Sequence, residues 1–231
     1  MTKKEILDAI HGQMIISCQA VEGEPLYVEE KSIMYLMARA AKQAGTPAIR
    51  TSSIRDVIAI KEETGLPVIG LVKVQYPGYE GFITPTMKEV DDLVAAGSDI
   101  VALDCTLRKR GDGSTVNEFI AQIREKYPDI ILMADISNYE EGINAWKCGV
   151  DIVGTTMSGY TSSVSDGPDY ELMERLSRDI NIPVIGEGRI HYPDQAVKAL
   201  QTGAWAIVVG GAITRPLEIA MRFQNAIKES R

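Results

Sequence analysis

The feature that most constrains the fold of this chain is an eightfold alternation between short apolar runs and longer segments whose apolar residues have helical spacing. The runs are rich in Val, Ile and Ala and predict strands at 14–19, 47–51, 67–74, 99–105, 131–136, 151–157, 183–187 and 205–210. The segments that follow them predict helices at 32–44, 54–64, 87–96, 116–126, 139–148, 170–180, 193–202 and 216–229. Strands that are apolar along their whole length are typical of parallel sheets covered on both faces. Eight such units favour a closed (β/α)₈ barrel.

The junctions between units resemble one another. AAGSDIVALD, KCGVDIVGTT and QTGAWAIVVG each place a glycine between a helix end and a buried strand, and the glycines that suit a helix C-terminus are Gly45, Gly65, Gly97, Gly149 and Gly203. A unit of about 27 residues matches a TIM barrel. An open, doubly wound sheet is the alternative, but it usually has a glycine-rich turn after its first strand, where this chain has IISCQAVEGEPL. We therefore expect an α/β fold, with residues 1–231 forming a single (β/α)₈ domain that begins with a short N-terminal helix.

Composition limits the partners. The net charge of −8 and the pI near 4.9 argue against nucleic acid and anionic membranes, which require a basic surface. The chain has neither a signal-peptide pattern nor an apolar run of the roughly 18 to 20 residues that a membrane span requires, so we expect a cytoplasmic protein. The three cysteines are widely spaced and predict reduced thiols, without disulfides or a zinc site.

Polar residues recur where the predicted strands stop. Active sites of (β/α)₈ barrels lie at the C-terminal ends of the strands, so these residues are the first candidates for function. Taken alone, each is more often a solvated loop residue, but their recurrence at successive strand ends predicts a site that gathers cations in an acidic protein. The residues are Gln19, Arg50, Lys73, Asp104, Asp135, Thr155, Thr156, Glu187 and Arg189, with Arg108, Lys109 and Arg110 just beyond the fourth strand.

The loops after the seventh and eighth strands, IGEGRI and VVGGAITRP, predict a phosphate site. In this fold these two loops often bind phosphate through backbone N–H groups and a helix N-terminus. Glycines let the backbone approach an anion closely, and arginines add charge. The candidates are Gly188, Arg189, Gly210, Gly211 and Arg215; the alternative is that the glycines only relieve crowding at the barrel rim.

Lys73 and Glu187 are the candidate catalytic residues. A lysine on an apolar strand loses hydration, which lowers its pKa toward the range of a useful base, although it can also extend its amine to the rim. Asp135 is placed to orient either group. Neither His11 nor His191 ends a strand, which argues against a histidine-centred mechanism. We expect no metal and no cofactor.

Two connections, 75–86 and 158–170, are long for a compact domain. Long polar loops with glycine are candidate lids over a substrate, and plain surface loops are the alternative.

The segments IISCQA, EGEPL, AIR, PVIGLVK, ITPTMKEVDDL, VALDCT, MADIS, GTTMSGYT, EGRI and VVGGAITRP resemble, in order, the N-acetylmannosamine-6-phosphate 2-epimerase family. The resemblance covers nearly the whole chain and implies a cofactor-free (β/α)₈ enzyme of sialic acid catabolism that interconverts N-acetylmannosamine 6-phosphate and N-acetylglucosamine 6-phosphate. It implies that Lys73 transfers the proton and that Glu187 is the active-site carboxylate. It further implies that Gln19, Arg50, Asp135 and Arg215 bind the substrate. We also expect Thr155 to bind the substrate, because it lies at the end of the sixth predicted strand. Val74 departs from the family pattern, in which we expect a basic residue.

The residues leave other functions open. Lys73 on a barrel strand also suits a Schiff-base aldolase or lyase acting on a phosphosugar. A non-catalytic phosphosugar sensor would use the same barrel without turnover. The resemblance favours a homodimer, whereas the apolar face of the last helix, Ile219, Phe223 and Ile227, is expected to pack on its own barrel.

Overall fold

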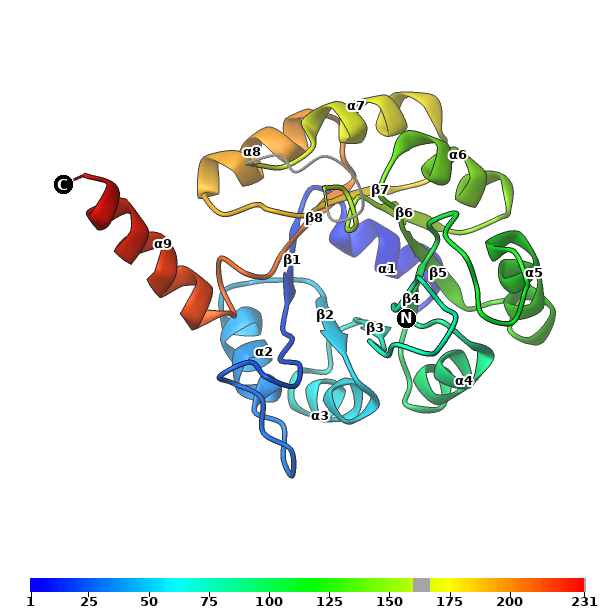
Figure 1. Ribbon diagram of the computed structural model, residues 1–231, viewed down its shortest axis with the longest axis horizontal. Coiled ribbons are helices and arrows are strands. Elements are labelled where there is room, and N and C mark those ends of the chain that lie inside the picture. Colours follow the sequence, from blue (N-terminus) through cyan, green and yellow to red (C-terminus); the bar gives the residue numbers. More distant parts are fainter. Residues whose placement is uncertain (160–166, 231) are drawn as a thin grey trace.

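The computed structural model describes residues 1–159 and 167–230, and its eight parallel strands close into a barrel in the order β1 to β8 (Figure 1). The strands are β1 (Met14–Ser17), β2 (Ile49–Ser52), β3 (Val68–Leu71), β4 (Ile100–Asp104), β5 (Ile131–Asp135), β6 (Ile152–Gly154), β7 (Val184–Glu187) and β8 (Ala206–Val209). The helices are α1 (Lys3–Ile10), α2 (Met34–Gln43), α3 (Ile54–Thr64), α4 (Met87–Ala95), α5 (Val116–Lys126), α6 (Tyr139–Lys147), α7 (Tyr170–Asp179), α8 (Pro193–Gln201) and α9 (Pro216–Glu229). The (β/α)₈ barrel and the N-terminal helix are confirmed.

The third strand is shorter than predicted. It ends at Leu71, after which the chain turns back on itself: the Thr84 N–H donates to the Val72 carbonyl (2.7 Å) and the Val74 N–H to that of Phe82 (3.0 Å). Lys73 therefore lies opposite Ile83 in an antiparallel bridge and not in the sheet. The apolar run continues because this hairpin is itself packed on the barrel.

The helix ends follow the glycine pattern. Gly65 ends α3 in the left-handed conformation with a φ of 65°, which costs a residue without a Cβ little. Gly45, Gly97, Gly149 and Gly203 likewise have positive φ at the ends of α2, α4, α6 and α8. The predicted glycine positions are confirmed.

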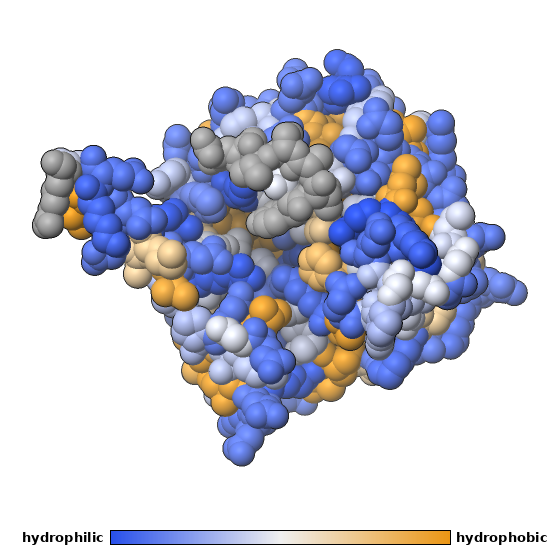
Figure 2. Space-filling model, in the orientation of Figure 1, coloured by the Kyte–Doolittle hydropathy of each residue, from blue (hydrophilic) through white to orange (hydrophobic). Residues whose placement is uncertain are grey.

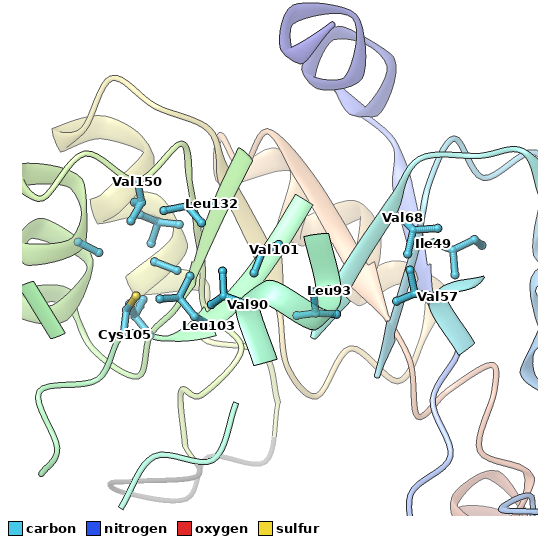
Figure 3. Close-up of a cluster of buried hydrophobic side chains, with 14 of the residues drawn as sticks. Ile49, Val57, Val68, Val90, Leu93, Val101, Leu103, Cys105, Leu132 and Val150 are labelled. Carbon is cyan, nitrogen blue, oxygen red and sulfur yellow. The ribbon is translucent and has the colours of Figure 1, made fainter. Parts of the chain in front are cut away.

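Side chains alternate between the two faces of the barrel wall, since successive residues of a strand point to opposite faces. Outward residues such as Ile49, Val68, Val101 and Leu132 belong to the cluster that packs on the surrounding helices (Figure 3). Inward residues such as Ile69 belong to a second cluster that fills the barrel. The interior is a packed core and not a channel.

Helix α1 closes the N-terminal end of the barrel. Ile6 and Ile10 are buried in the same cluster as the barrel interior. The Trp205 indole donates to the Leu7 carbonyl (2.9 Å) and stacks on His11. With this end plugged, the C-terminal ends of the strands are the open mouth.

Helix α9 does not pack on its own barrel. It leaves between α8 and α2 and points away from the strands (Figure 1), and none of its residues is buried. Phe223, which we expected to pack on the barrel together with Ile219 and Ile227, is 70% exposed. That prediction is wrong, because the helix axis carries its apolar face away from the strands.

Candidate active site

A cavity of about 240 Å³ lies at the C-terminal mouth of the barrel. This face is shown in Figure 2, where hydrophilic residues predominate around the centre. The cavity is lined by Ser17, Gln19, Arg50, Lys73, Phe82, Ile83, Thr156, Met157, Glu187, Gly188, Arg189, Ile190, His191, Val208, Gly210, Gly211, Thr214, Arg215 and Glu218.

Strand alternation brings a charged group of three residues to the floor of this cavity. Arg50 and Glu187 lie two residues after the inward-facing Ala48 and Ile185, and so point inward as well. The Arg50 guanidinium is 2.7 Å from the Asp135 carboxylate and 3.4 Å from that of Glu187. Arg50 and Asp135 are almost completely buried, at 1% and 0% side-chain exposure. The two carboxylates hold the buried Arg50 guanidinium in one orientation and compensate its charge.

The surroundings of Glu187 raise the pKa of its carboxyl group. Its pKa is raised to about 7, chiefly by burial; the Arg50 charge opposes this shift and the neighbouring Asp135 charge adds to it. The Thr156 hydroxyl lies 2.6 Å from Asp135 and 3.2 Å from Glu187, joining the two carboxyl groups. Glu187 therefore exists in both protonation states at the pH of a cell.

Lys73 reaches the cavity from the opposite side, since β3 and β7 are four strands apart in a closed barrel of eight. Its amine makes no hydrogen bond or ion pair within the described part of the chain. The pKa of Lys73 is lowered to about 8, chiefly by burial and in part by the nearby Arg215 and Arg50 charges. With this pKa about a tenth of the amine is neutral at pH 7 and available as a base.

The loops after β7 and β8 form one wall of the cavity. Gly188 and Arg189 both have positive φ, 110° and 54°, and for Arg189 this is a conformation that residues with a Cβ rarely adopt outside functional sites. The N–H groups of Gly188 and Gly211 donate to no other described residue. Pro216 begins α9, as predicted, and its missing N–H costs nothing at that position.

Most predicted site residues meet in this cavity. Those that line it are Gln19, Arg50, Lys73, Glu187, Gly188, Arg189, Gly210, Gly211 and Arg215, while Asp135 lies beneath it against Arg50. Thr155 is not placed to contact a ligand: it is fully buried, and its hydroxyl is hydrogen-bonded to the backbone of Glu187. Thr156, one residue later, lines the cavity in its place.

The basic cluster beyond the fourth strand does not line the cavity. Arg108 forms an ion pair with Asp104 (2.7 Å), and the Arg110 guanidinium lies 4.0 Å from the centre of the Phe119 ring and donates to the Pro85 carbonyl. Asp104 binds Arg108 and Thr106 instead of the cavity residues. These groups hold the loop after β4 against the barrel.

Several lining residues were not predicted from the sequence. Phe82 and Ile83 come from the 75–86 connection, which therefore supplies part of the cavity wall. Nothing in the sequence marks them, because the hairpin that returns them to Lys73 depends on tertiary contacts. Ser17 carried a usable signal, since it lies two residues before Gln19 on the inward side of its strand and accepts a hydrogen bond from it (2.8 Å).

Of the second long connection, residues 160–166 lie outside the described residues. Within the described part of the chain, no three His, Cys, Asp or Glu side chains are grouped so as to hold a metal ion. No helix among the described residues is long and apolar enough to cross a membrane.

The fold and the site define a (β/α)₈ barrel with glycine loops after its last two strands and an amine and a carboxyl group that line one cavity at its mouth. Comparison with known proteins identifies the family. Residues 34–229 match the family described as "Putative N-acetylmannosamine-6-phosphate epimerase", and the chain belongs to this family.

Individual relatives agree over the full length. The chain is 54% identical to the "Putative N-acetylmannosamine-6-phosphate 2-epimerase" of Caldanaerobacter subterraneus subsp. tengcongensis. The match covers 98% of this chain and 96% of the relative. It is 48% identical to the structurally characterised N-acetylmannosamine-6-phosphate 2-epimerase of Clostridium perfringens, with a TM-score of 0.90 over 96% of each chain. A thiamine phosphate pyrophosphorylase of Pyrococcus furiosus, at 19% identity and a TM-score of 0.58 over 94% of this chain and 96% of that one, shares the barrel fold alone.

Proposed function

We propose that this chain is the epimerase that interconverts N-acetylmannosamine 6-phosphate and N-acetylglucosamine 6-phosphate in amino-sugar and sialic acid catabolism. The observation that carries the proposal is the unpaired, partly neutral Lys73 facing a partly protonated Glu187, beside an anion cradle. The family membership and the relatives' descriptions name the sugar.

The phosphate group fits the wall formed by Gly188, Arg189, Gly210 and Gly211. The unused N–H groups of Gly188 and Gly211 are donors for its oxygens, and the N-terminus of α9 adds a favourable dipole. Holding the phosphate there fixes the sugar chain across the mouth, toward Lys73.

Inversion at carbon 2 begins with removal of the proton next to the C1 aldehyde of the opened sugar. Neutral Lys73 is the base for this step, because its amine is close in pKa to the working pH and carries no competing ion pair. The electrons of the C2–H bond pass into an enolate, in which the C1 oxygen becomes negative. Return of a proton to the opposite face of carbon 2, from protonated Lys73 or from protonated Glu187, completes the reaction with no change of redox state.

Arg50 and Glu187 are placed to stabilise that oxygen. Arg50 lines the cavity while Asp135 beneath it fixes the guanidinium, so the cation needs little rearrangement when the charge develops. Glu187, in its protonated form, donates to the same oxygen or to a neighbouring hydroxyl.

Deuterated water tests the proton transfer. Incubation with N-acetylmannosamine 6-phosphate should give N-acetylglucosamine 6-phosphate that carries deuterium at carbon 2. Turnover with no deuterium at that position would rule out exchange of the C2 proton with solvent.

Two further assays separate the alternatives. Borohydride added during turnover should trap no adduct on Lys73 if the amine acts as a base, whereas a Schiff-base enzyme would be reduced to a stable secondary amine. Lys73→Met should bind inorganic phosphate as the native protein does but lose turnover. A sensor would bind the sugar phosphate and release it unchanged.

We also propose that residues 1–231 act as one catalytic domain in the cytoplasm and assemble as a homodimer. Large apolar side chains on α9, including Leu217, Met221, Phe223 and Ile227, are more than half exposed, and an amphipathic helix is stable when such a face is covered. In a regular barrel the helix after β8 packs between the first and the last of the other helices, and we propose that α9 of a second copy takes that position here. Sedimentation equilibrium should give twice the chain mass, and a monomer at micromolar concentration would contradict the proposal.

A further inference from the structure

We infer that Phe82 determines which acyl group the site accepts on the nitrogen of carbon 2, by forming the apolar surface on which the acetyl methyl packs. The inference rests on the proposed function and adds to it a subsite for one part of the substrate. It predicts an order of preference among N-acyl groups and the residue that sets this order.

The apolar part of the cavity wall has one half-buried member. Five large apolar side chains line the cavity: Phe82, Ile83, Met157, Ile190 and Val208. The last four are at most 4% exposed, because they pack within the buried clusters of the barrel, whereas Phe82 is half-buried. Among the described residues that line the cavity, Phe82 is therefore the large apolar side chain with surface left for a ligand.

Phe82 lies beside the proposed base. Its carbonyl accepts the Val74 N–H (3.0 Å), and the next residue, Ile83, lies opposite Lys73 in the antiparallel bridge. In the proposed reaction Lys73 takes the proton from carbon 2, so this carbon must lie within reach of the amine. The acetamido nitrogen is bonded to the same carbon. The acyl group is thereby brought to the hairpin that carries both Lys73 and Phe82.

The other end of the substrate is fixed away from this hairpin. The proposed phosphate site lies in the glycine loops after β7 and β8, and the phosphate is attached to carbon 6, at the far end of the open chain from carbon 2. Ile190 and Val208 belong to these same two units, and Met157 follows β6. With the phosphate bound there, the acyl group is nearer to Phe82 than to these three side chains.

Backbone strain holds the hairpin just after Phe82. Thr84 is fully buried with a φ of 47°, which is rare for a β-branched residue. Its hydroxyl donates to the Ala102 carbonyl (2.7 Å) and accepts the Val72 N–H (3.2 Å). Strain of this kind persists only where the surroundings impose it, and it is concentrated at functional sites. The mechanism proposed above does not use Thr84, and positioning of Phe82 gives this strain a function.

The connection after β4 holds the hairpin just before Phe82. The Glu80 N–H donates to the Lys109 carbonyl (3.0 Å), and the Glu80 carboxylate accepts the Lys109 N–H (3.2 Å). Gly81 lies so close to Asp104 that a Cβ at this position would be 2.8 Å from a carboxylate oxygen. The backbone on both sides of Phe82 is thus fixed, so the ring is a firm wall and not a mobile cover.

The cavity is too small for a much larger acyl group. Its volume of about 240 Å³ is below the roughly 300–1,000 Å³ of most ligand sites. A firm aromatic wall stabilises a methyl group by contact and excludes a longer chain by overlap. In an apolar pocket one carbon more or less changes kcat/KM by about tenfold or more. The native enzyme should therefore prefer N-acetyl over both N-formyl and N-butanoyl mannosamine 6-phosphate by at least about tenfold.

Variants of Phe82 should change this order. Phe82→Ala should lose about tenfold in kcat/KM for the N-acetyl ester, lose nothing for the N-formyl ester, which has no methyl, and gain for the N-butanoyl ester. Phe82→Leu keeps an apolar side chain and should lie between the native enzyme and Phe82→Ala. Tyr79→Ala is the matched control, because Tyr79 is a half-buried aromatic residue of the same connection that does not line the cavity. This control should keep the native order.

The readouts are kcat/KM for the three esters, far-UV circular dichroism for folding, and calorimetric titration with inorganic phosphate, whose affinity should be native in every variant. Folded Phe82→Ala and Phe82→Leu variants that keep the native order of the three esters would overturn the inference. Equal losses for the N-formyl and N-acetyl esters would also overturn it.

Calorimetric binding of the same esters separates this inference from the proposed reaction. A native protein that binds the N-acetyl ester more tightly than the N-formyl ester but does not turn it over would refute the reaction. Loss of that difference in Phe82→Ala would still support the acyl subsite, and its persistence would overturn it.

Discussion

Replacing Lys73 by methionine should abolish turnover and, at the same time, make the protein more stable at neutral pH. Methionine keeps the length and the apolar stem of lysine but removes the charge. The native cavity holds the charged amine without an ion pair among the described residues and beside the Arg50 and Arg215 cations.

The size of the effect follows from the pKa. Burial lowers the pKa of Lys73 from 10.5 to about 8. Because one pKa unit corresponds to about 1.4 kcal/mol, the charged amine at pH 7 costs the folded state at most about 3.5 kcal/mol. For a chain of this size each kcal/mol moves Tm by about 2–4 °C. Lys73→Met should therefore raise Tm by up to about 7–14 °C at pH 7.

The dependence on pH has a definite sign. The folded-state pKa is below the unfolded-state value, so the folded form loses its proton first as pH rises. The native protein gains stability between pH 8 and 10.5, and the penalty is fully present below pH 8. The gap between the variant and the native protein should be largest near pH 7 and narrow toward pH 10.5.

Thermal unfolding of both proteins at pH 7 and pH 9.5 measures the gap, with Lys31→Met, at an exposed lysine, as the matched control. Loss of a base should lower kcat by at least about 10²-fold in the C2 exchange assay. A variant that is less stable than the native protein at pH 7, or a gap that does not change with pH, would refute the reasoning.

Asp135→Asn removes a negative charge that raises the pKa of Glu187, so the ionisation near pH 7 in the kcat/KM profile should move to lower pH; a shift upward would contradict the assignment. The same variant leaves buried Arg50 with one carboxylate and should lower the free energy of unfolding by about 3 kcal/mol, measured by urea titration. Gly188→Ala places a Cβ at a φ of 110° and should raise KM for the sugar phosphate more than it lowers kcat; an unchanged KM would remove this loop from phosphate binding. Thr156→Val removes the hydroxyl between Asp135 and Glu187 and should lower kcat more than Thr155→Ser, which keeps its backbone hydrogen bonds; equal effects would show that the hydroxyl of Thr156 is not special.

The strands and helices were predictable because their signals are local. Apolar runs, helical spacing and glycines at helix ends each act within a few residues, and they identified eight units, the number that favours a closed barrel. The inward direction of Arg50 and Glu187 also follows from the sequence, since alternation along a strand continues to its end.

The depth and pairing of these groups were decided by the tertiary structure. Thr155 and Thr156 are equivalent in the sequence, yet the register of β6 beside β7 buries the first against the Glu187 backbone and exposes the second to the cavity. The three basic residues 108–110 follow a strand end as Arg189 does. However, Arg108 pairs with Asp104 and Arg110 packs on Phe119, so neither lines the cavity.

The sequence by itself determined a (β/α)₈ barrel, the strand ends that carry chemistry, and a lysine and a carboxylate among them, because these depend on periodicity and on position within a unit. Only the tertiary structure showed that Lys73 lies in a hairpin opposite Ile83 and that Arg50 lies between the carboxylates of Asp135 and Glu187. It also showed that α9 points away from its own barrel. The physical reason is that these features depend on contacts between units distant in sequence, where burial and charge pairing, and not local propensity, set the free energy.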